Sequence, residues 1–161
     1  MNTASQPFKI FLVDDDPYFT GLLQQQLEGL GFKDISSFVK SADCLDQLTQ
    51  KPDLVFLDFN MDNLNGIDIL KKIKRFNPDQ LVVFVSGQQK IDIAVNALKY
   101  GAFDYIIKED ISEARLKVVL EKVRHFQELL SKQQKRSRIK KLLSNIGLAS
   151  TVLLIQKIFT R

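Results

Sequence analysis

Three carboxylates in a row follow a short apolar run near the start of the chain. Asp14, Asp15 and Asp16 come directly after "KIFLV" at residues 9–13, and Asp58 ends a second apolar run. Two like charges about 4 Å apart repel by roughly 4 kcal/mol at an effective dielectric constant near 20. Carboxylates that meet therefore need a cation or a raised pKa. Oxygen ligands without His or Cys favour a hard divalent ion, and a site with few carboxylates and room for water suits Mg²⁺.

Two other polar residues also end apolar runs. Ser86 ends "LVVFVS", and Lys108 ends "FDYIIK". Carboxylate, Mg²⁺, ammonium and hydroxyl together suit a transferred phosphoryl group, whose oxygens need neutralising on several sides. An aspartate can itself be the nucleophile and form an acyl phosphate. If these residues meet, the sequence predicts phosphoryl-transfer chemistry.

The segments that must position these residues are short apolar runs separated by stretches of helical period. The runs are rich in Val, Ile and Phe, and they lie at 9–13, 34–39, 54–58, 81–86 and 103–108. Three of them are apolar nearly throughout, as expected of strands covered on both faces. The helical stretches lie at 17–29, 42–51, 66–76, 90–100 and 112–130. This alternation predicts an α/β fold with a doubly wound, five-stranded parallel sheet and five helices. Ligands of such sheets gather at the carboxyl ends of the strands, where the polar residues stand.

Several helix ends carry capping residues. Asp16 is expected to cap the helix that begins at Pro17, and Ser41 and Ser112 are expected to cap the second and fifth helices. "GLG" at 29–31 and Gly101 are expected to end the first and fourth helices. Of the three consecutive carboxylates, two are thus predicted to hold metal and the third to start a helix.

Residues 8–130 resemble the receiver domain of bacterial two-component response regulators. The matching motifs are the acidic pair in "LVDDD", the central aspartate in "VFLDFNMDNLNG", the hydroxyl residue in "VFVSG", and "GAFDYIIK" with its lysine. The resemblance implies a flavodoxin-like sheet with strand order 2-1-3-4-5. It also implies that Asp58 is the phosphoacceptor.

The resemblance further implies roles for the residues around Asp58. The metal ligands would be Asp14, Asp15, Asp58 and the backbone carbonyl of Asn60, with Asp15 touching Mg²⁺ directly. Ser86 would bond a phosphoryl oxygen, and Lys108 would pair with the phosphoryl group. Tyr105 matches an aromatic switch that turns inward when Ser86 is drawn to the phosphate.

By the same resemblance, the phosphoryl donor would be a sensor histidine kinase or a histidine phosphotransfer protein. The role would be signalling, with no enzyme activity beyond self-phosphorylation and self-dephosphorylation. The switch would change the surface made by the fourth helix, fifth strand and fifth helix, which could serve a partner or a homodimer. Two alternatives are a degenerate receiver acting as a constitutive interaction module and an aspartyl-phosphate hydrolase. Such hydrolases generally carry a second carboxylate two residues past the nucleophile, where this chain has Asn60.

Two positions depart from the family pattern. Glu109 follows the lysine where the family commonly has proline, so we expect a trans Lys108–Glu109 bond, since a cis bond before a non-proline residue costs about 2.5–4 kcal/mol. Asp62 stands where many members have proline and places another carboxylate near the pocket. Phosphorylation is expected to survive both changes.

Composition indicates a globular protein with one appended segment. The chain is 45% apolar and 26% charged, which fits a folded domain. Its single cysteine, Cys44, is expected to pack in the second helix and fits a reducing compartment. The first residues hold no apolar run long enough for a signal peptide, so we expect a cytoplasmic protein.

Charge divides the chain near residue 131. Residues 1–130 carry 15 Lys/Arg against 19 Asp/Glu, whereas residues 131–161 carry eight Lys/Arg and no acid. We therefore expect a receiver domain over 1–130 and a basic amphipathic helical tail over 131–161.

Four interpretations of the tail stay open at this point. It could extend the fifth helix and dimerise, lie on an anionic membrane surface, or lead into an output domain outside this chain. Its apolar stretch is too short to span a bilayer, which needs roughly 20 residues. Direct nucleic-acid binding is disfavoured because no recognisable reading motif accompanies the positive charge.

Overall fold

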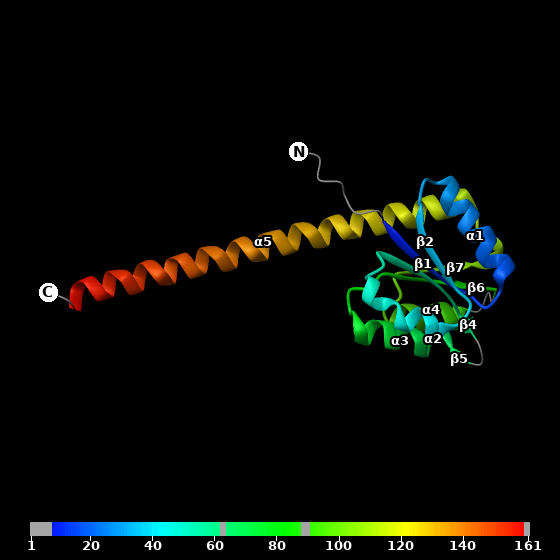
Figure 1. Cartoon of the computed structure of the whole chain (residues 1–161), viewed down its shortest axis with the longest axis horizontal. Helices are drawn as coiled ribbons and strands as arrows, with labels where there is room; N and C mark the ends of the chain where they lie inside the picture. Colours follow the sequence, from blue (N-terminus) through cyan, green and yellow to red (C-terminus); the bar gives the residue numbers. More distant parts are fainter. Residues whose placement is uncertain (1–7, 62–63, 88–90, 160–161) are drawn as a thin grey trace. The chain divides into compact units, whose positions relative to one another are not determined.

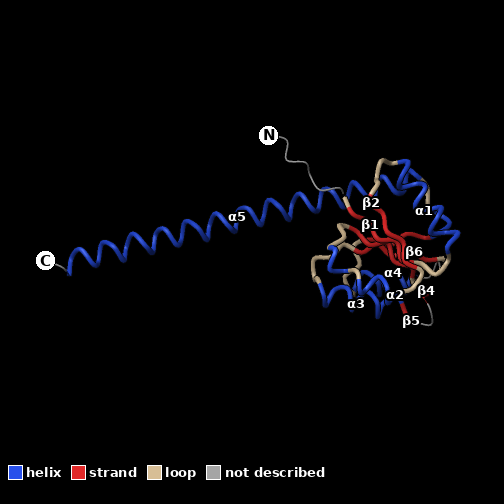
Figure 2. The backbone as a smooth tube through the Cα atoms, viewed as in Figure 1, coloured by secondary structure: helices blue, strands red, loops and turns tan. Residues whose placement is uncertain are grey.

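A computed structural model describes residues 8–61, 64–87 and 91–159. Five parallel strands form one sheet in the order β2-β1-β3-β6-β7, which is the predicted 2-1-3-4-5 order. The strands are β1 Lys9–Val13, β2 Asp34–Phe38, β3 Leu54–Asp58, β6 Val82–Ser86 and β7 Asp104–Ile107. Figure 1 shows the sheet with its helices, and Figure 2 separates the strands from the helices by colour.

Five α-helices occur in the described ranges, and they alternate with the strands as predicted. They are α1 Pro17–Gly29, α2 Ser41–Asp46, α3 Gly66–Phe76, α4 Ile91–Lys99 and α5 Glu113–Phe159. Two short 3₁₀ helices also occur, η1 Leu48–Gln50 and η2 Lys108–Asp110. A small antiparallel ribbon, β4 Asn60–Met61 with β5 Leu64–Asn65, follows β3 and was not predicted.

The helix ends test the predicted caps. Asp16 caps α1 by accepting hydrogen bonds from Tyr18 N and Phe19 N at 3.0 and 3.3 Å, and Ser112 Oγ accepts one from Arg115 N at 3.2 Å. Both caps are confirmed.

The predicted cap of the second helix is wrong. Ser41 is the first residue of α2 and is buried, and Lys40 before it makes no side-chain cap bond. Ser41, Cys44 and Leu48 are all buried, so the inward face of this segment begins at Ser41. The serine contributes to packing where the sequence pattern indicated a helix end.

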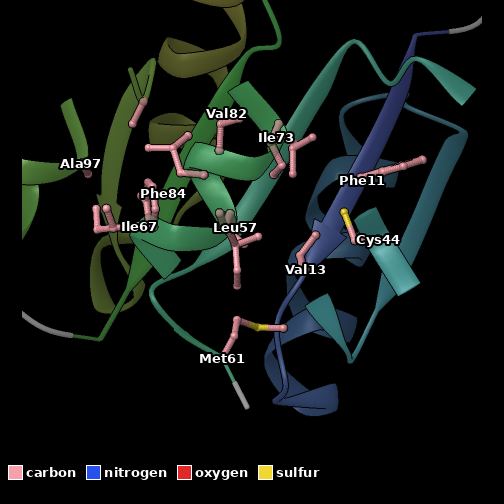
Figure 3. Packing of buried hydrophobic residues seen from close by; sticks show 14 of the residues in the cluster. Phe11, Val13, Cys44, Leu57, Met61, Ile67, Ile73, Val82, Phe84 and Ala97 are labelled. Atoms are coloured by element: carbon pink, nitrogen blue, oxygen red, sulfur yellow. The ribbon is translucent and has the colours of Figure 1, made fainter. Parts of the chain in front are cut away.

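The three central strands β1, β3 and β6 are buried on both faces. On one face, strand residues such as Phe11, Leu57 and Phe84 pack in one cluster with residues of α2, α3 and α4, including Cys44 and Ile73 (Figure 3). Alternate strand residues point to the opposite face, where α1 and the first turns of α5 lie (Figure 2). Both faces are covered, so the chemistry of the sheet is confined to its ends.

The chain divides into two compact units, Met1–Leu120 and Glu121–Arg161. The helix α5 continues through residue 131, where charge composition changes. The boundary expected from charge therefore does not coincide with a helix end, and it stays a prediction. Among the described residues, no helix is long and apolar enough to cross a membrane.

Candidate functional site

The carboxyl ends of β1 and β3 bring two aspartates side by side. Val13 pairs with Leu57 in the parallel register of these strands, so Asp14 and Asp58 follow at the same level of the sheet edge. Both are buried, with 4% of their surface exposed. Lys108, directly after β7, places its Nζ 2.7 Å from Asp14 Oδ2 and 3.1 Å from Asp58 Oδ1. Residues distant in sequence thus share one charged cluster.

A third carboxylate completes a possible metal site. Oxygens of Asp14, Asp15 and Asp58 lie within 4.8 Å of one another, and Asp15 is exposed to solvent. This donor set consists of hard oxygens and one solvent-facing ligand, which fits a small divalent cation that keeps part of its water shell. Asp16 is committed to the cap of α1, and its own N–H donates to Asp14 Oδ1 at 2.9 Å.

Burial and neighbouring charge perturb the two central groups. Burial first, and then the charge of Asp14, raise the pKa of Asp58, while Lys108 and the N–H of Asn60 act in the opposite direction. Burial alone would lower the pKa of Lys108, but its hydrogen bond to Asp14 and the charges of both aspartates outweigh burial and raise it. Ionisation of Asp58 is therefore less favourable than that of a solvent-exposed aspartate.

An apolar pocket lies beside the two buried aspartates. It lies between α1 and the sheet, reaches Asp14 and Asp58, and is otherwise lined mainly by apolar residues such as Phe19, Leu23 and Phe56. Asp14 and Asp58 are thus flanked by apolar side chains on this side.

The ribbon after β3 orients Asn60. Asn60 N donates to Asp58 Oδ2 at 2.8 Å. In the ribbon, Gly66 N donates to Phe59 O, which makes Asn60 and Asn65 a non-hydrogen-bonded pair. In such a pair both backbone groups point away from the partner strand. The Asn60 carbonyl is therefore not used in the ribbon, as a metal ligand requires.

Ser86 and Tyr105 lie on the two strands beyond β3. Ser86 ends β6 and is completely buried, and Ile107 of β7 lies beside it in the register. Tyr105 lies within β7, is partly buried and packs against the core cluster. Its carbonyl accepts a hydrogen bond from Arg115 of α5 at 3.2 Å.

The family model of the response regulator receiver domain matches residues 10–121. The chain belongs to this family. Receiver domains bind Mg²⁺ at an acidic pocket and are phosphorylated by histidine kinases in two-component systems. This receiver has a cluster of three aspartates, Asp14, Asp15 and Asp58, with oxygens close enough to share one cation.

Similar proteins support the same assignment. The receiver is 39% identical to the transcriptional regulatory protein ZraR of Klebsiella oxytoca over 106 residues, covering 65% of this chain and 24% of ZraR. It is 36% identical to the DNA-binding transcriptional regulator NtrC of Klebsiella pneumoniae over 120 residues, covering 73% of this chain and 25% of NtrC. The chain thus spans about a quarter of the length of these relatives.

Solved structures agree in fold. The receiver domain of NtrX from Brucella abortus superposes with a TM-score of 0.66 at 30% identity, covering 71% of this chain and 97% of that one. A chain of the CheX-CheY-BeF3-Mg+2 complex from Borrelia burgdorferi gives 0.67 at 25% identity, covering 73% and 89%. The flavodoxin-like receiver fold expected from the sequence is confirmed.

Two residues at the site were missed from the sequence. Lys108 Nζ lies over the ring of Phe19, 4.4 Å from its centroid, a cation–π distance. Gly66 approaches the acceptor backbone so closely that a Cβ there would lie 2.8 Å from both Asp58 O and Phe59 O. For Gly66, the signal available in the sequence was its position directly after the helix cap Asn65. Nothing in the local sequence indicates that Phe19 contacts Lys108.

The two departures from the family pattern have different outcomes. Glu109 lies in η2, and the described residues contain no cis peptide bond, as expected for Lys108–Glu109. Asp62 lies outside the described residues. Lys108 reaches both carboxylates with glutamate in the following position.

Proposed function

We propose that this chain is a phosphoaccepting response regulator in which Asp58 receives a phosphoryl group from a histidine kinase or histidine phosphotransfer protein. One observation carries the proposal most directly. Asp58 and Asp14 are buried at the rim of the sheet and share the ammonium of Lys108. The same rim offers three carboxylates to a cation.

The chemistry follows from the groups that face Asp58. The ionised carboxylate attacks the phosphorus of a phosphohistidine, the P–N bond breaks, and the leaving imidazole takes a proton from solvent. The product is an acyl phosphate on Asp58. Lys108, already 3.1 Å from Asp58 Oδ1, neutralises negative charge on the transferred group.

Asp14, Asp15, Asp58 and the carbonyl of Asn60 would hold Mg²⁺. When bound, the cation supplies positive charge against the phosphoryl oxygens. The raised pKa of Asp58 supports this assignment. The reaction needs the ionised carboxylate, and a bound cation would favour that form. The similar CheY complex from Borrelia burgdorferi contains BeF3 and Mg.

Phosphorylation would act through Ser86 and Tyr105. Phosphoryl contacts that exist in only one of two conformations favour that conformation. The affected surface would be α4, β7 and α5, where α4 exposes apolar side chains at helical spacing. Ile91, Val95 and Leu98 are 77%, 56% and 50% exposed. Signalling through this surface, without catalytic turnover, is the proposed role.

Phosphorylation of the purified chain tests the function. Acetyl phosphate with Mg²⁺ should add one phosphoryl group, detected by mass spectrometry of the intact protein, and EDTA should prevent it. Asp58→Asn should abolish the addition. Asp46→Asn, the same change at an exposed carboxylate on α2, should leave it intact. Unimpaired labelling of Asp58→Asn would refute the assignment, and multiple-turnover hydrolysis of a phosphate monoester would favour a hydrolase.

A further inference from the structure

The helix α5 carries a strongly basic stretch in the unit Glu121–Arg161. Residues 131–142, called here the basic segment, contain six Lys or Arg and no acidic residue. All of them are exposed. The basic residues are Lys132, Lys135, Arg136, Arg138, Lys140 and Lys141.

Two large apolar side chains stand among these charges. Ile139 is 58% exposed and Leu142 is 61% exposed. Because they are three residues apart on a helix, they lie on the same face. Exposed aliphatic groups among ammonium and guanidinium groups are complemented by a partner that is both apolar and anionic.

The basic segment of a second copy offers apolar side chains but no negative charge. The last acidic residue of the sequence is Glu128, so two basic segments side by side would find no carboxylate within either segment. Like charges facing each other on paired helices oppose association. A coiled coil also needs apolar residues every 3.5 positions, and residues 131–138 contain none.

A nucleic acid supplies negative charge but no apolar environment. Phosphates along a nucleic-acid backbone would attract the six basic residues, but such contacts leave Ile139 and Leu142 without an apolar environment. An anionic bilayer supplies both, since its surface is negatively charged and acyl chains lie just beneath the headgroups.

We propose that the basic segment binds the surface of an anionic bilayer, with Ile139 and Leu142 entering the headgroup region. The Lys and Arg side chains contact lipid phosphates, and each contributes about fivefold in affinity near such a surface. The helix lies in the plane of the interface, with its basic side chains reaching the headgroups around Ile139 and Leu142. This interaction goes beyond phosphorylation of Asp58 and does not depend on it.

Vesicle sedimentation of the full chain tests the proposal. The probes are phosphatidylcholine vesicles and vesicles with about one third phosphatidylglycerol, in about 0.1 M and 0.5 M salt. The chain should sediment with the anionic vesicles only, and affinity should fall at least about tenfold at the higher salt. Equal sedimentation with neutral vesicles, or none with either, would overturn the proposal.

Two double variants separate the apolar and the charged contributions. Ile139→Ser with Leu142→Ser keeps every charge and should weaken vesicle binding at least about tenfold. Lys140→Gln with Lys141→Gln should weaken it about 25-fold. Full binding by the serine variant would show that charge alone acts and would overturn the proposed entry of Ile139 and Leu142 into the headgroup region.

A control variant and a second measurement complete the test. Lys72→Gln with Arg75→Gln removes the same charge from exposed positions on α3 and should leave binding within about twofold, because these residues lie outside the basic segment. Sedimentation velocity without vesicles should show no self-association that depends on Ile139 and Leu142. Such self-association would make a second copy the partner. Labelling of Asp58 in each variant reports the phosphoacceptor function separately.

Discussion

Replacing Lys108 by methionine tests whether its ammonium, which Asp14 and Asp58 share, stabilises the fold. Lys108 Nζ lies 2.7 Å from Asp14 and 3.1 Å from Asp58. At an effective dielectric constant near 20 these distances correspond to attractions of about 6 and 5 kcal/mol. Desolvation of the three groups offsets most of that attraction. Removing one partner of such a buried pair costs about 3–5 kcal/mol, because the remaining charges stay buried.

We therefore expect Lys108→Met to lower the free energy of unfolding by about 3–5 kcal/mol in EDTA at neutral pH. Urea denaturation followed by circular dichroism measures this loss. Lys117→Met is the matched control, since Lys117 pairs with Glu113 at 2.6 Å but both side chains are more than half exposed. An exposed pair contributes at most about 1 kcal/mol.

A second variant distinguishes electrostatics from packing. Asp58→Asn removes one of the two buried charges that Lys108 compensates, so Lys108→Met should cost less in the Asp58→Asn background. A coupling of at least about 1 kcal/mol is expected for groups in direct contact. The proposed role of Lys108 is wrong if Lys108→Met lowers the free energy of unfolding no more than Lys117→Met does. It is also wrong if Lys108→Met costs the same with Asp58 and with Asn at position 58.

Three other measurements examine individual features. Gly66→Ala should destabilise the fold by about 1–3 kcal/mol because its Cβ would meet backbone at 2.8 Å, whereas Gly21→Ala in α1, with nothing within 4 Å, should stabilise it by about 0.5–1 kcal/mol. The raised pKa of Asp58 means that the folded state holds this proton more tightly than the unfolded state, so stability in EDTA should fall as pH rises from 3.8 through the raised pKa. In the Asp58→Asn variant, the urea midpoint should lose this part of its dependence on pH. Burial raises the pKa of Cys44 to about 12, so a thiol reagent at pH near 8 should label it only on unfolding.

The sheet and the charged residues at its carboxyl edge could be predicted, because short stretches of sequence indicate them. Val- and Ile-rich runs give strands covered on both faces, and the polar residue that ends each run must lie at the carboxyl edge of a parallel sheet. Asp14, Asp58 and Lys108 were therefore expected to converge, and they do. Asp16 was separable from the other carboxylates because Pro17 marks the start of a helix.

The features that were missed depend on contacts between distant segments. The ribbon of β4 and β5 has two residues in each strand, too few to produce a periodic pattern. Gly66 is required by the approach of one backbone to another, and glycine alone does not reveal which atoms approach. Ser41 matched a cap pattern, but tertiary packing buried it at the start of α2.

The position of Lys108 shows how such contacts can substitute for a local constraint. Family members commonly have proline after this lysine, and this chain has Glu109. The ammonium is nevertheless contacted from three directions, by Asp14 after β1, by Asp58 at the end of β3 and by the ring of Phe19 in α1. The two carboxylates attract the ammonium, and the face of the aromatic ring stabilises it further. Because these groups come from three separate elements, they position the ammonium without a constraint from the residue that follows it.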